Sequence, residues 1–336
     1  METLEQKGFL EWEDGLKCNM AATHVKNLPN GDMIGVCTEI GEKGKKFITS
    51  YRVTKDNIHK RDVIGRVPTN SLLYQHAFGM SEEYIAIFEH PVTVSLMDLI
   101  LGYDMIHAMH LNQTATTKIH LVSIADGSFK TIETGIYFQM VHMGNSFVKD
   151  GKFICDATIY QDTEGNVFEV MEFEKLKQGL EKINYDNAWK RFEIDLSSGE
   201  LAMKDLSVLK YGSYDLPTYN PKYDGVKENC FTYMMELYAK QVMDESYGFD
   251  IVKFDACQEQ EVARWGSPGH LPNEAYFIEN PEGETEDDGV LVSISFDFWN
   301  DVSKVLILDP RDMTLLQEYE MPFRIPITYH SGFWRK

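Results

Sequence analysis

Short strand-like runs, separated by turn residues, fill most of this chain and constrain its fold more than any other feature. β-branched, aromatic and apolar runs alternate with Gly, Asp, Asn and Pro, as in DMIGVCTEI, KKFITSYRV, YIAIFEH, KFICDATIYQDTEG and DDGVLVSISFD. This spacing predicts an all-β fold, which is a sandwich, a barrel or a propeller. The sequence has no crisp internal repeat, no low-complexity linker and no break in composition, so we predict a single domain over residues 1–336.

Two segments depart from this strand pattern, and we predict a helix in each of them. Residues 171–191 are rich in charge and predict a helix inserted on the outside of the sheets. In residues 92–111, several apolar side chains fall on one helical face: Leu96, Leu99, Ile100, Tyr103 and Ile106. That face either packs on the protein's own core or dips into a membrane and admits a lipid-like ligand. No run of 18 uncharged apolar residues occurs, so we expect no membrane-spanning helix.

Charge and cysteine content bear on partners and location. The sequence has 53 acidic and 32 basic residues, a formal net charge of -21 at pH 7. Phosphate backbones are bound mainly through Lys and Arg, so we expect no nucleic-acid partner. The N-terminus METLEQKGFLEWEDG lacks the apolar core of a signal peptide. The cysteines are widely spaced, so we expect reduced thiols and a cytoplasmic location: Cys18, Cys37, Cys155, Cys230 and Cys257.

Four of the ten histidines share a setting beside a strand or turn with small, aromatic or methionine neighbours. They are His24 in MAATHVKNLPNGD, His76 in YQHAFGM, His142 in YFQMVHMGNSF and His330 in RIPITYHSGFW. His59, His90 and His120 show no special pattern. His107 and His110 form an i, i+3 pair without a nearby third ligand, so we favour a surface or packing role for them.

A histidine that leaves water needs hydrogen-bond partners, so each of the four is either a satisfied core residue or a ligand. In a propeller the innermost strands converge on the axis, where such distant residues can meet. Imidazole suits Zn, Cu, Fe and Ni, whereas structural zinc sites usually include cysteine. An octahedral ion with four imidazole ligands would keep two open positions for dioxygen and a substrate. The context of the histidines alone leaves both interpretations open.

Five stretches carry a recognisable pattern: LLYQHAFGMSEEYIAIFEHPV, NEAYFIENPEGETEDDGVLVSISFD, KVLILDPRDMTLLQEYEMPFRIPITYHSGFW, AATHVKNLPNGD and MVHMGNSFVKDGKFICDATIYQD. Together they resemble the carotenoid cleavage oxygenase family, especially its animal branch with the β-carotene oxygenases and the retinoid isomerase. The EDDGV and RIPxxxH pieces are the most specific. The resemblance runs from about residue 20 to the end, whereas residues 1–19 show none.

The resemblance implies a seven-bladed β-propeller with a small helical cap over one face. It implies Fe2+ on the propeller axis, held by His24, His76, His142 and His330. It also implies carboxylates that accept the other ring N–H of three ligands and so fix ring orientation and tautomer. Glu274 in NEAYF matches one of them. Asp215 in YDLPTYN stands where the family usually has Glu, and its missing methylene could lengthen that hydrogen bond or shift the backbone.

Family members are longer at the N-terminus than this sequence. The difference corresponds to roughly two blades of about 40–45 residues each, and to the third carboxylate. We therefore expect a propeller that is incomplete at its N-terminus and exposes apolar edges.

The resemblance implies an enzyme, a non-haem iron dioxygenase. Dioxygen would add across a double bond of a carotenoid or apocarotenoid and yield two aldehydes, with retinal as a product, and no general acid or base is required. The implied partners are a carotenoid or retinoid substrate, dioxygen and a membrane contacted peripherally. Two alternatives stay open: a retinoid isomerase, and a catalytically silent truncated propeller that binds a lipid or a partner. Tyr74, Phe78 and Phe138 flank the ligands, and core packing explains them equally well.

Overall fold

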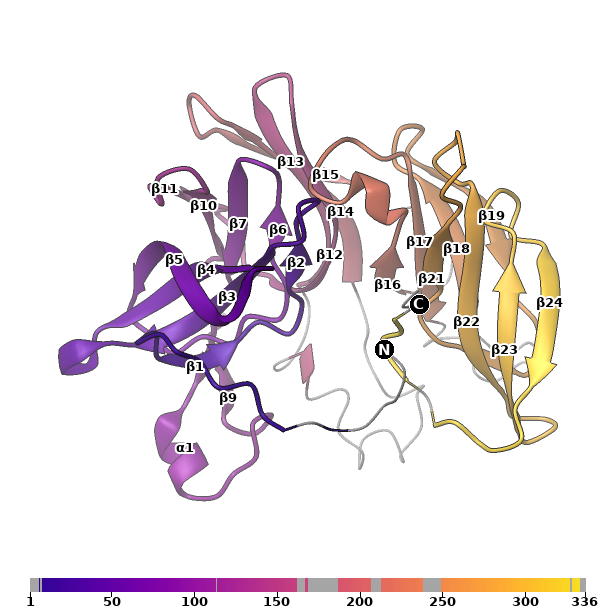
Figure 1. The fold of residues 1–336 in the computed structure, drawn as a ribbon, viewed down its shortest axis with the longest axis horizontal. Coiled ribbons are helices and arrows are strands. Elements are labelled where there is room, and N and C mark those ends of the chain that lie inside the picture. Colours follow the sequence, from indigo (N-terminus) through magenta and orange to yellow (C-terminus); the bar gives the residue numbers. More distant parts are fainter. Residues whose placement is uncertain are drawn as a thin grey trace.

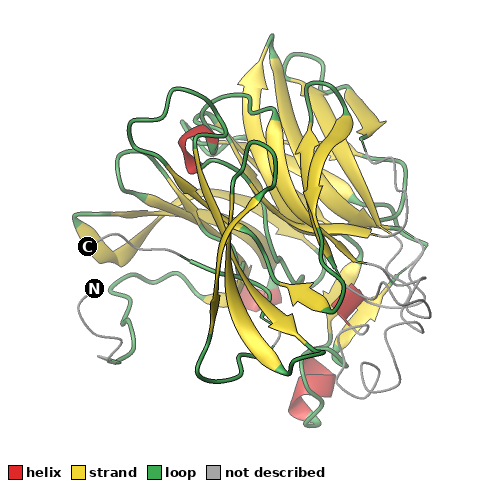
Figure 2. Ribbon diagram, turned by 90° about the vertical axis from the view of Figure 1, so that its right-hand side faces the viewer, coloured by secondary structure: helices red, strands yellow, loops and turns green. Residues whose placement is uncertain are grey.

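The computed structural model describes residues 6, 8–112, 114–161, 167–168, 187–206, 213–237, 249–326 and 328–332. In this part of the chain the fold is all-β, as the sequence predicts, with five blade-like antiparallel sheets and one small two-stranded sheet. The five sheets follow one another along an arc in chain order (Figure 1). Strands dominate, and the helices are short (Figure 2).

The first three sheets come from the N-terminal part of the chain. The first sheet has the order β1 (Cys18–Ala21), β3 (Met33–Ile40), β4 (Lys46–Thr54) and β5 (Asn57–Thr69), with β2 (Lys26–Asn27) paired to β3. The second has the order β11 (Phe129–Glu133), β10 (Lys118–Ser123), β7 (Tyr84–Glu89) and β6 (Gly79–Met80). The third has the order β12 (Gln139–Lys149), β13 (Lys152–Tyr160), β14 (Asn187–Asp195) and β15 (Leu201–Asp205).

The remaining elements complete the arc. The fourth sheet has the order β16 (Ser213–Thr218), β17 (Phe231–Leu237), β18 (Asp250–Asp255) and β19 (Gln260–Trp265). The fifth has the order β20 (His270–Pro272), β22 (Gly289–Asp297), β23 (Val302–Leu308) and β24 (Leu315–Glu320), with β21 (Tyr276–Glu279) paired to β22. The small sheet pairs β8 (Val92–Val94) with β9 (Met109–Leu111), and the short helices are α1 (Leu96–Ile100), η1 (Glu42–Gly44) and η4 (Pro221–Tyr223).

Among the described residues, the largest buried apolar cluster lies between the second and third sheets. Strands β12 and β13 are buried along nearly their whole length, which requires neighbours on both faces of the third sheet. The rings of Phe88, Phe138 and Phe192 lie 5.2–6.2 Å apart in this core, and all three are fully buried. Burying one such side chain stabilises the fold by roughly 1.5–3 kcal/mol, so this contact fixes the third sheet against the second.

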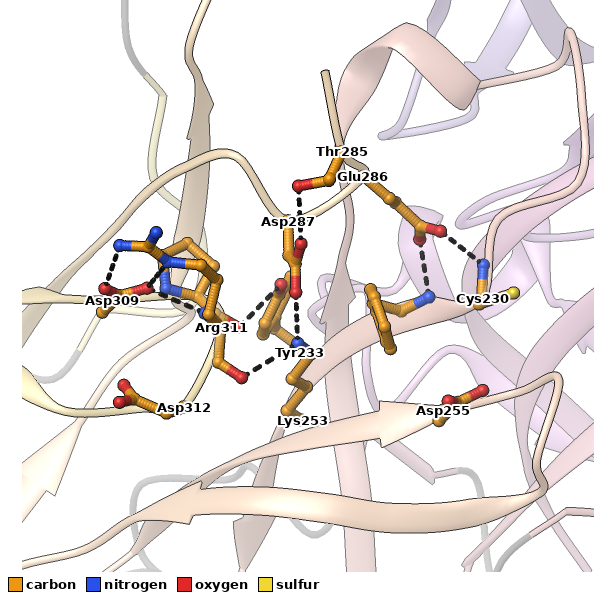
Figure 3. A network of polar contacts seen from close by, with 12 residues as sticks. Cys230, Tyr233, Lys253, Asp255, Thr285, Glu286, Asp287, Asp309, Arg311 and Asp312 are labelled. Atoms are coloured by element: carbon orange, nitrogen blue, oxygen red, sulfur yellow. Dashed lines mark hydrogen bonds and ion pairs between the residues drawn. The ribbon is translucent and has the colours of Figure 1, made fainter. Parts of the chain in front are cut away.

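Polar side chains join the fourth sheet to the fifth (Figure 3). Glu286, in the EDDGV motif between β21 and β22, accepts hydrogen bonds from the backbone N–H groups of Cys230 and Phe231 at 2.8 and 2.6 Å. Lys253 of β18, which is buried, donates to the Asp287 carboxylate at 2.7 Å and to the Arg311 carbonyl at 3.1 Å. One face of the fourth sheet is therefore held to two separate turns of the fifth.

The predicted helix over residues 92–111 is wrong for most of its length. The two ends of the segment pair as antiparallel strands, with Val92 opposite Leu111, and only α1 between them is helical. Ser95 caps α1 by accepting a hydrogen bond from the Asp98 N–H, which favours a helix start there. The helical spacing of apolar residues arose because some of them pack on the core, as Leu99 does, while Ile100 is 78% exposed.

The predicted helix over residues 171–191 is wrong from Asn187 onward, where β14 begins. Trp189 and Phe192 are both fully buried and, being three residues apart, point to opposite faces of the sheet, where each packs in a different apolar cluster. Residues 171–186 lie outside the described part of the chain. None of the described helices is long and apolar enough to cross a membrane.

Four of the five cysteines form disulfides, so the expectation of reduced thiols is wrong for these four. Cys18 of β1 bonds Cys37 of β3, with a Cα–Cα distance of 5.5 Å. Cys230, just before β17, bonds Cys257, just after β18, with a Cα–Cα distance of 5.1 Å. Cys155 is buried and free. Linear spacing did not show these pairs because antiparallel pairing brings their strands together.

Candidate metal centre

The four histidines singled out from the sequence meet at one point. His24 lies between β1 and β2, His76 lies in the extended segment before β6, and His142 lies within β12. Strands β1, β6 and β12 are edge strands of the first, second and third sheets. His330 lies in the segment after β24, which returns from the rim of the arc toward its middle (Figure 1).

Backbone contacts position the ligand segments. The N–H groups of Thr23 and His24 both donate to the His76 carbonyl, at 3.0 and 3.1 Å, so the first two ligand segments are tied together. His142 lies where the β12–β13 register shifts, between Met140 and Met143. Such an irregularity re-aims a side chain relative to a regular ladder.

The C-terminal ligand segment is held by the loop between β20 and β21. The Asn273 side chain donates to the Thr328 hydroxyl at 2.7 Å and accepts from the Thr328 N–H at 3.2 Å. The Glu274 carboxylate accepts from the Ser331 N–H at 2.9 Å. These contacts fix the chain on both sides of His330, which has no strand of its own.

The Nε2 atoms of the four rings face one another. The Nε2 atoms of His24 and His76 are 3.2 Å apart, as are those of His76 and His142. The Nε2 atoms of His142 and His330 are 3.3 Å apart, and the rings of His24 and His330 have centroids 4.6 Å apart. One ligand nitrogen from each ring lies within 4.8 Å of all the others.

The opposite ring nitrogens point outward to oxygen atoms. His142 Nδ1 lies 2.7 Å from the Asp215 carboxylate, and His330 Nδ1 lies 3.2 Å from the Glu274 carboxylate. His76 Nδ1 lies 3.0 Å from the Tyr74 hydroxyl. A carboxylate cannot donate, so the Nδ1 atoms of His142 and His330 carry the proton, and their Nε2 lone pairs are directed toward the centre.

Asp215 is fully engaged and its shorter side chain does not lengthen the bond to His142. Besides His142, it accepts from the Tyr160 hydroxyl at 2.5 Å and from the Leu216 N–H at 2.8 Å. Burial favours a higher pKa for Asp215, but His142 and the two donors outweigh it and hold the pKa below its usual range. The carboxylate is therefore ionised at neutral pH and supports an orienting role.

Burial also keeps the imidazoles of His24 and His76 neutral. Desolvation, followed by the neighbouring His142 and His330 rings, lowers the pKa of His24 to about 3. Desolvation and the neighbouring rings likewise lower the pKa of His76 to about 2. A neutral imidazole with an inward lone pair is the form that binds a metal.

These four residues fit a single metal ion. Imidazole nitrogens that bind at about 2.1 Å in adjacent octahedral positions are separated by about 3.0 Å, close to the Nε2 separations of 3.2–3.3 Å found here. If all four lone pairs face the centre, they repel one another across so short a distance, and a cation between them would remove that repulsion. A histidine-only set suits Fe2+ among other first-row ions.

The other residues considered from the sequence lie elsewhere or contribute differently. His107 and His110 are exposed and bond Asp104 and Asp98, at 2.7 and 2.5 Å. Phe78, like Phe138, is fully buried in an apolar cluster.

Sequence reasoning missed two hydroxyl contacts at the centre and one buried histidine away from it. Tyr160 was not considered, and the bond of Tyr74 to His76 was not foreseen, because a strand pattern does not show where a hydroxyl points. His120, which showed no pattern, is buried and bonds Glu89 at 2.6 Å.

The arc of sheets and the four converging imidazoles are those of an all-β protein with a candidate histidine-only metal centre. The family model described as "Retinal pigment epithelial membrane protein" matches residues 1–335. The chain therefore belongs to this family, and the family resemblance drawn from the motifs is confirmed. The match includes residues 1–19, where the motifs alone showed no resemblance.

Curated relatives and solved structures agree with this assignment. The chain is 23% identical to β,β-carotene 15,15'-dioxygenase of Gallus gallus and to the mitochondrial carotenoid-cleaving dioxygenase of Homo sapiens, over 99% of its own length and 70% and 65% of theirs. Its fold is similar to that of Synechocystis apocarotenoid oxygenase (ACO), with TM-scores of 0.73 for a variant and 0.74 for a cobalt-substituted form at 20% and 19% identity. These matches cover 92% of this chain and 64% of the solved ones. The chain thus spans about two thirds of the length of its relatives.

Proposed function

We propose that the four histidines hold Fe2+ and that the protein cleaves a double bond of a carotenoid or apocarotenoid with dioxygen. The single observation that carries this proposal is the convergence of the Nε2 atoms of His24, His76, His142 and His330. In the balanced reaction one carbon–carbon double bond breaks, and the two oxygen atoms of one dioxygen molecule end in two aldehydes. No further reductant is required.

Iron bound there would supply the reactivity toward dioxygen that amino-acid side chains lack. The chain's own residues bind and orient. Asp215 and Glu274 hold the proton on the outer nitrogen of His142 and His330, which leaves the inner nitrogens free as ligands. The four histidines would hold the ion as neutral ligands and would leave it able to bind small molecules. No side chain is needed as a general acid or base.

The names of the relatives support the substrate class. The relatives are a β,β-carotene dioxygenase, a carotenoid-cleaving dioxygenase and an apocarotenoid oxygenase. We take the five sheets as blades of the propeller that this family forms, with seven blades in the full ring. Because the chain spans about two thirds of its relatives' length, its own substrate and bond selectivity are part of the proposal.

A cleavage assay tests the proposal. The chain is loaded with Fe2+ under anaerobic conditions, mixed with a panel of carotenoids, apocarotenoids and retinyl esters in detergent, and exposed to dioxygen. We expect paired aldehydes from wild type and none from His142→Ala. Absence of aldehydes with every polyene, despite bound iron, would overturn the dioxygenase proposal. Isomerised retinoid without aldehydes would support the isomerase instead.

We further propose that an exposed apolar patch around α1 contacts a membrane, where a carotenoid would be dissolved. The patch is formed by exposed side chains: Leu96, Met97, Ile100, Leu101, Tyr103 and Met105. It lies on a lobe that projects from the arc (Figure 1). The two acidic residues nearby, Asp98 and Asp104, bond His110 and His107, which limits the cost of bringing them to an interface.

Vesicle sedimentation tests the membrane contact. The double variant Ile100→Glu with Leu101→Glu should lose binding to phosphatidylcholine vesicles, since both side chains are largely exposed, at 78% and 66%. Leu316→Glu, on the exposed strand β24, is the matched control and should bind as wild type does. Equal binding by all three proteins would remove α1 from the membrane contact.

A further inference from the structure

Three of the candidate ligands have an outer nitrogen in contact with an oxygen, but the third contact differs in kind. His142 and His330 meet carboxylates, whereas His76 meets the hydroxyl of Tyr74 at 3.0 Å. A carboxylate can only accept a hydrogen bond, but a hydroxyl can donate or accept. Which ring nitrogen of His76 carries the proton therefore depends on how the Tyr74 hydroxyl is itself held.

We propose that Tyr74 is the positioning residue for His76 and does with a neutral hydroxyl what Asp215 and Glu274 do with carboxylates. This inference rests on the proposed function, because it concerns a ligand of the same metal. If Tyr74 donated to His76 Nδ1, the ring proton would have to lie on Nε2, pointing at the Nε2 atoms of His24 and His142. That tautomer cannot bind a metal at Nε2, so the metal-competent state requires Tyr74 to accept.

A second contact allows Tyr74 to accept from His76. Its hydroxyl lies 3.3 Å from the Thr23 hydroxyl, which gives the tyrosine proton a place to go. The chain of donors then runs from His76 Nδ1–H to Tyr74 and from Tyr74 O–H to Thr23. The backbone N–H groups of Thr23 and His24 donate to the His76 carbonyl. Thr23 is therefore held next to His76 by its backbone as well as through Tyr74.

Ring packing holds Tyr74 where its hydroxyl can act. Its ring meets the Phe168 ring edge-on with centroids 5.2 Å apart, and Phe168 lies 5.6 Å from the His76 ring. Replacing Tyr74 with Phe therefore removes the hydroxyl and keeps the shape that packs. Core packing explains the ring, but it does not explain the hydroxyl placed between Thr23 and His76.

The inference predicts how strongly each support matters. Removing an outer partner of a metal-binding histidine typically lowers metal affinity by about 10–100-fold. A hydrogen bond to a neutral hydroxyl is weaker than one to a charged carboxylate. We therefore expect Tyr74→Phe to lower affinity by about 10-fold, near the lower end of that range, and Asp215→Asn to lower it by about 100-fold.

The test uses Co2+ alone as the probe, added to the metal-free chain of residues 1–336. The readouts are the affinity, the visible absorption of bound cobalt and the rate of cobalt loss to a chelator. Tyr74→Phe should bind about 10-fold more weakly, lose cobalt faster and show a shifted cobalt band. Thr23→Val should move all three readouts in the same direction by less, and Thr23→Ser should restore wild-type values. Tyr319→Phe, on the exposed strand β24, is the control and should match wild type.

The outcomes separate the inference from the proposed function. If Tyr74→Phe and Thr23→Val both match wild type, the positioning role of Tyr74 is overturned and the metal centre is not affected. If Tyr74→Phe does not fold, as judged by circular dichroism, Thr23→Val against Thr23→Ser decides the question. Wild type that binds no cobalt would overturn both the inference and the metal centre. Wild type that binds cobalt, and also iron, but cleaves no polyene would overturn only the proposed activity.

Discussion

The third and fifth sheets both help to hold a candidate ligand, yet they are built in different ways. His142 lies within β12, and β12 and β13 are buried along nearly their whole length. His330 lies beyond β24, a strand whose six residues are all exposed. About a third of the His330 side chain is exposed to solvent. One ligand is therefore part of a covered strand, while the other is on a segment at the exposed end of the arc.

The difference shows that apolar packing and hydrogen bonding each place different ligands of the same candidate metal centre. Apolar packing, which is strong and needs no direction, places His142 together with its sheet. Hydrogen bonds with the side chains of Asn273 and Glu274 place His330, since the described residues around it pair with no strand. We therefore expect the third sheet to govern the stability of the fold, and the polar contacts of the fifth to govern only the local order of its ligand.

The largest expected effect separates core from edge. Phe192→Ala should lower the free energy of unfolding by about 3–5 kcal/mol, because Phe192 is fully buried between Phe88 and Phe138. Leu316→Ala on β24 should change it by less than about 0.5 kcal/mol. Urea unfolding followed by tryptophan fluorescence measures both. Equal losses would break the comparison, because β24 would then be as well packed as the third sheet.

The two ends of the arc differ in covalent support, which sharpens the comparison. The first sheet is cross-linked by Cys18–Cys37, whereas the fifth sheet contains no cysteine in the sequence. Replacing both cysteines with Ser should lower the free energy of unfolding by about 3 kcal/mol, as expected for a closed loop of this length. Chemical unfolding measures the loss, and a reducing agent should have no further effect at this pair.

The disulfides also set a test of location. Disulfides persist in oxidising compartments, whereas a cytoplasmic location favours free thiols. Mass spectrometry of chain extracted from its own cells, with thiols blocked at lysis, distinguishes the two. Cys155 should be the one free thiol if both disulfides form. Five blocked thiols would contradict the pairing and favour the cytoplasm.

A smaller effect separates the two carboxylates. Asp215 is buried and lies 2.7 Å from His142, while Glu274 lies 3.2 Å from the more exposed His330. Asp215→Asn should therefore lower metal affinity by about 100-fold and Glu274→Gln by about 10-fold. Titration of the metal-free variants with Fe2+ under anaerobic conditions measures both. A larger loss for Glu274→Gln would reverse the ranking.

A related substitution probes how tightly Asp215 fits. Both of its oxygen atoms already have partners within 2.8 Å, so the extra methylene of Asp215→Glu would displace the carboxylate from these partners. We expect this variant to bind metal more weakly than wild type, although it restores the residue that the family usually has. Affinity equal to that of wild type would show that the local backbone can shift.

The all-β fold and the four histidines could be predicted from the sequence because both leave local signals. Strand runs and turn residues mark the sheets, and each histidine lies in a motif that the family shares. The segment 92–111 was misjudged because the apolar spacing of a strand–helix–strand unit resembles that of one helix. Disulfide pairs and hydroxyl contacts, such as that of Tyr74, depend on strands brought together in space, and linear spacing carries no record of them.

The metal content of the folded chain tests the central claim most directly. Wild type, loaded with Fe2+ under anaerobic conditions and freed of excess ion, should retain about one iron per chain, because four imidazoles surround one position. His142→Ala and His76→Ala should each retain almost none, while His107→Ala, whose imidazole lies outside the centre, should match wild type. Iron that is absent from wild type, or retained equally by the His142 and His76 variants, would contradict the proposal that these histidines form one metal centre.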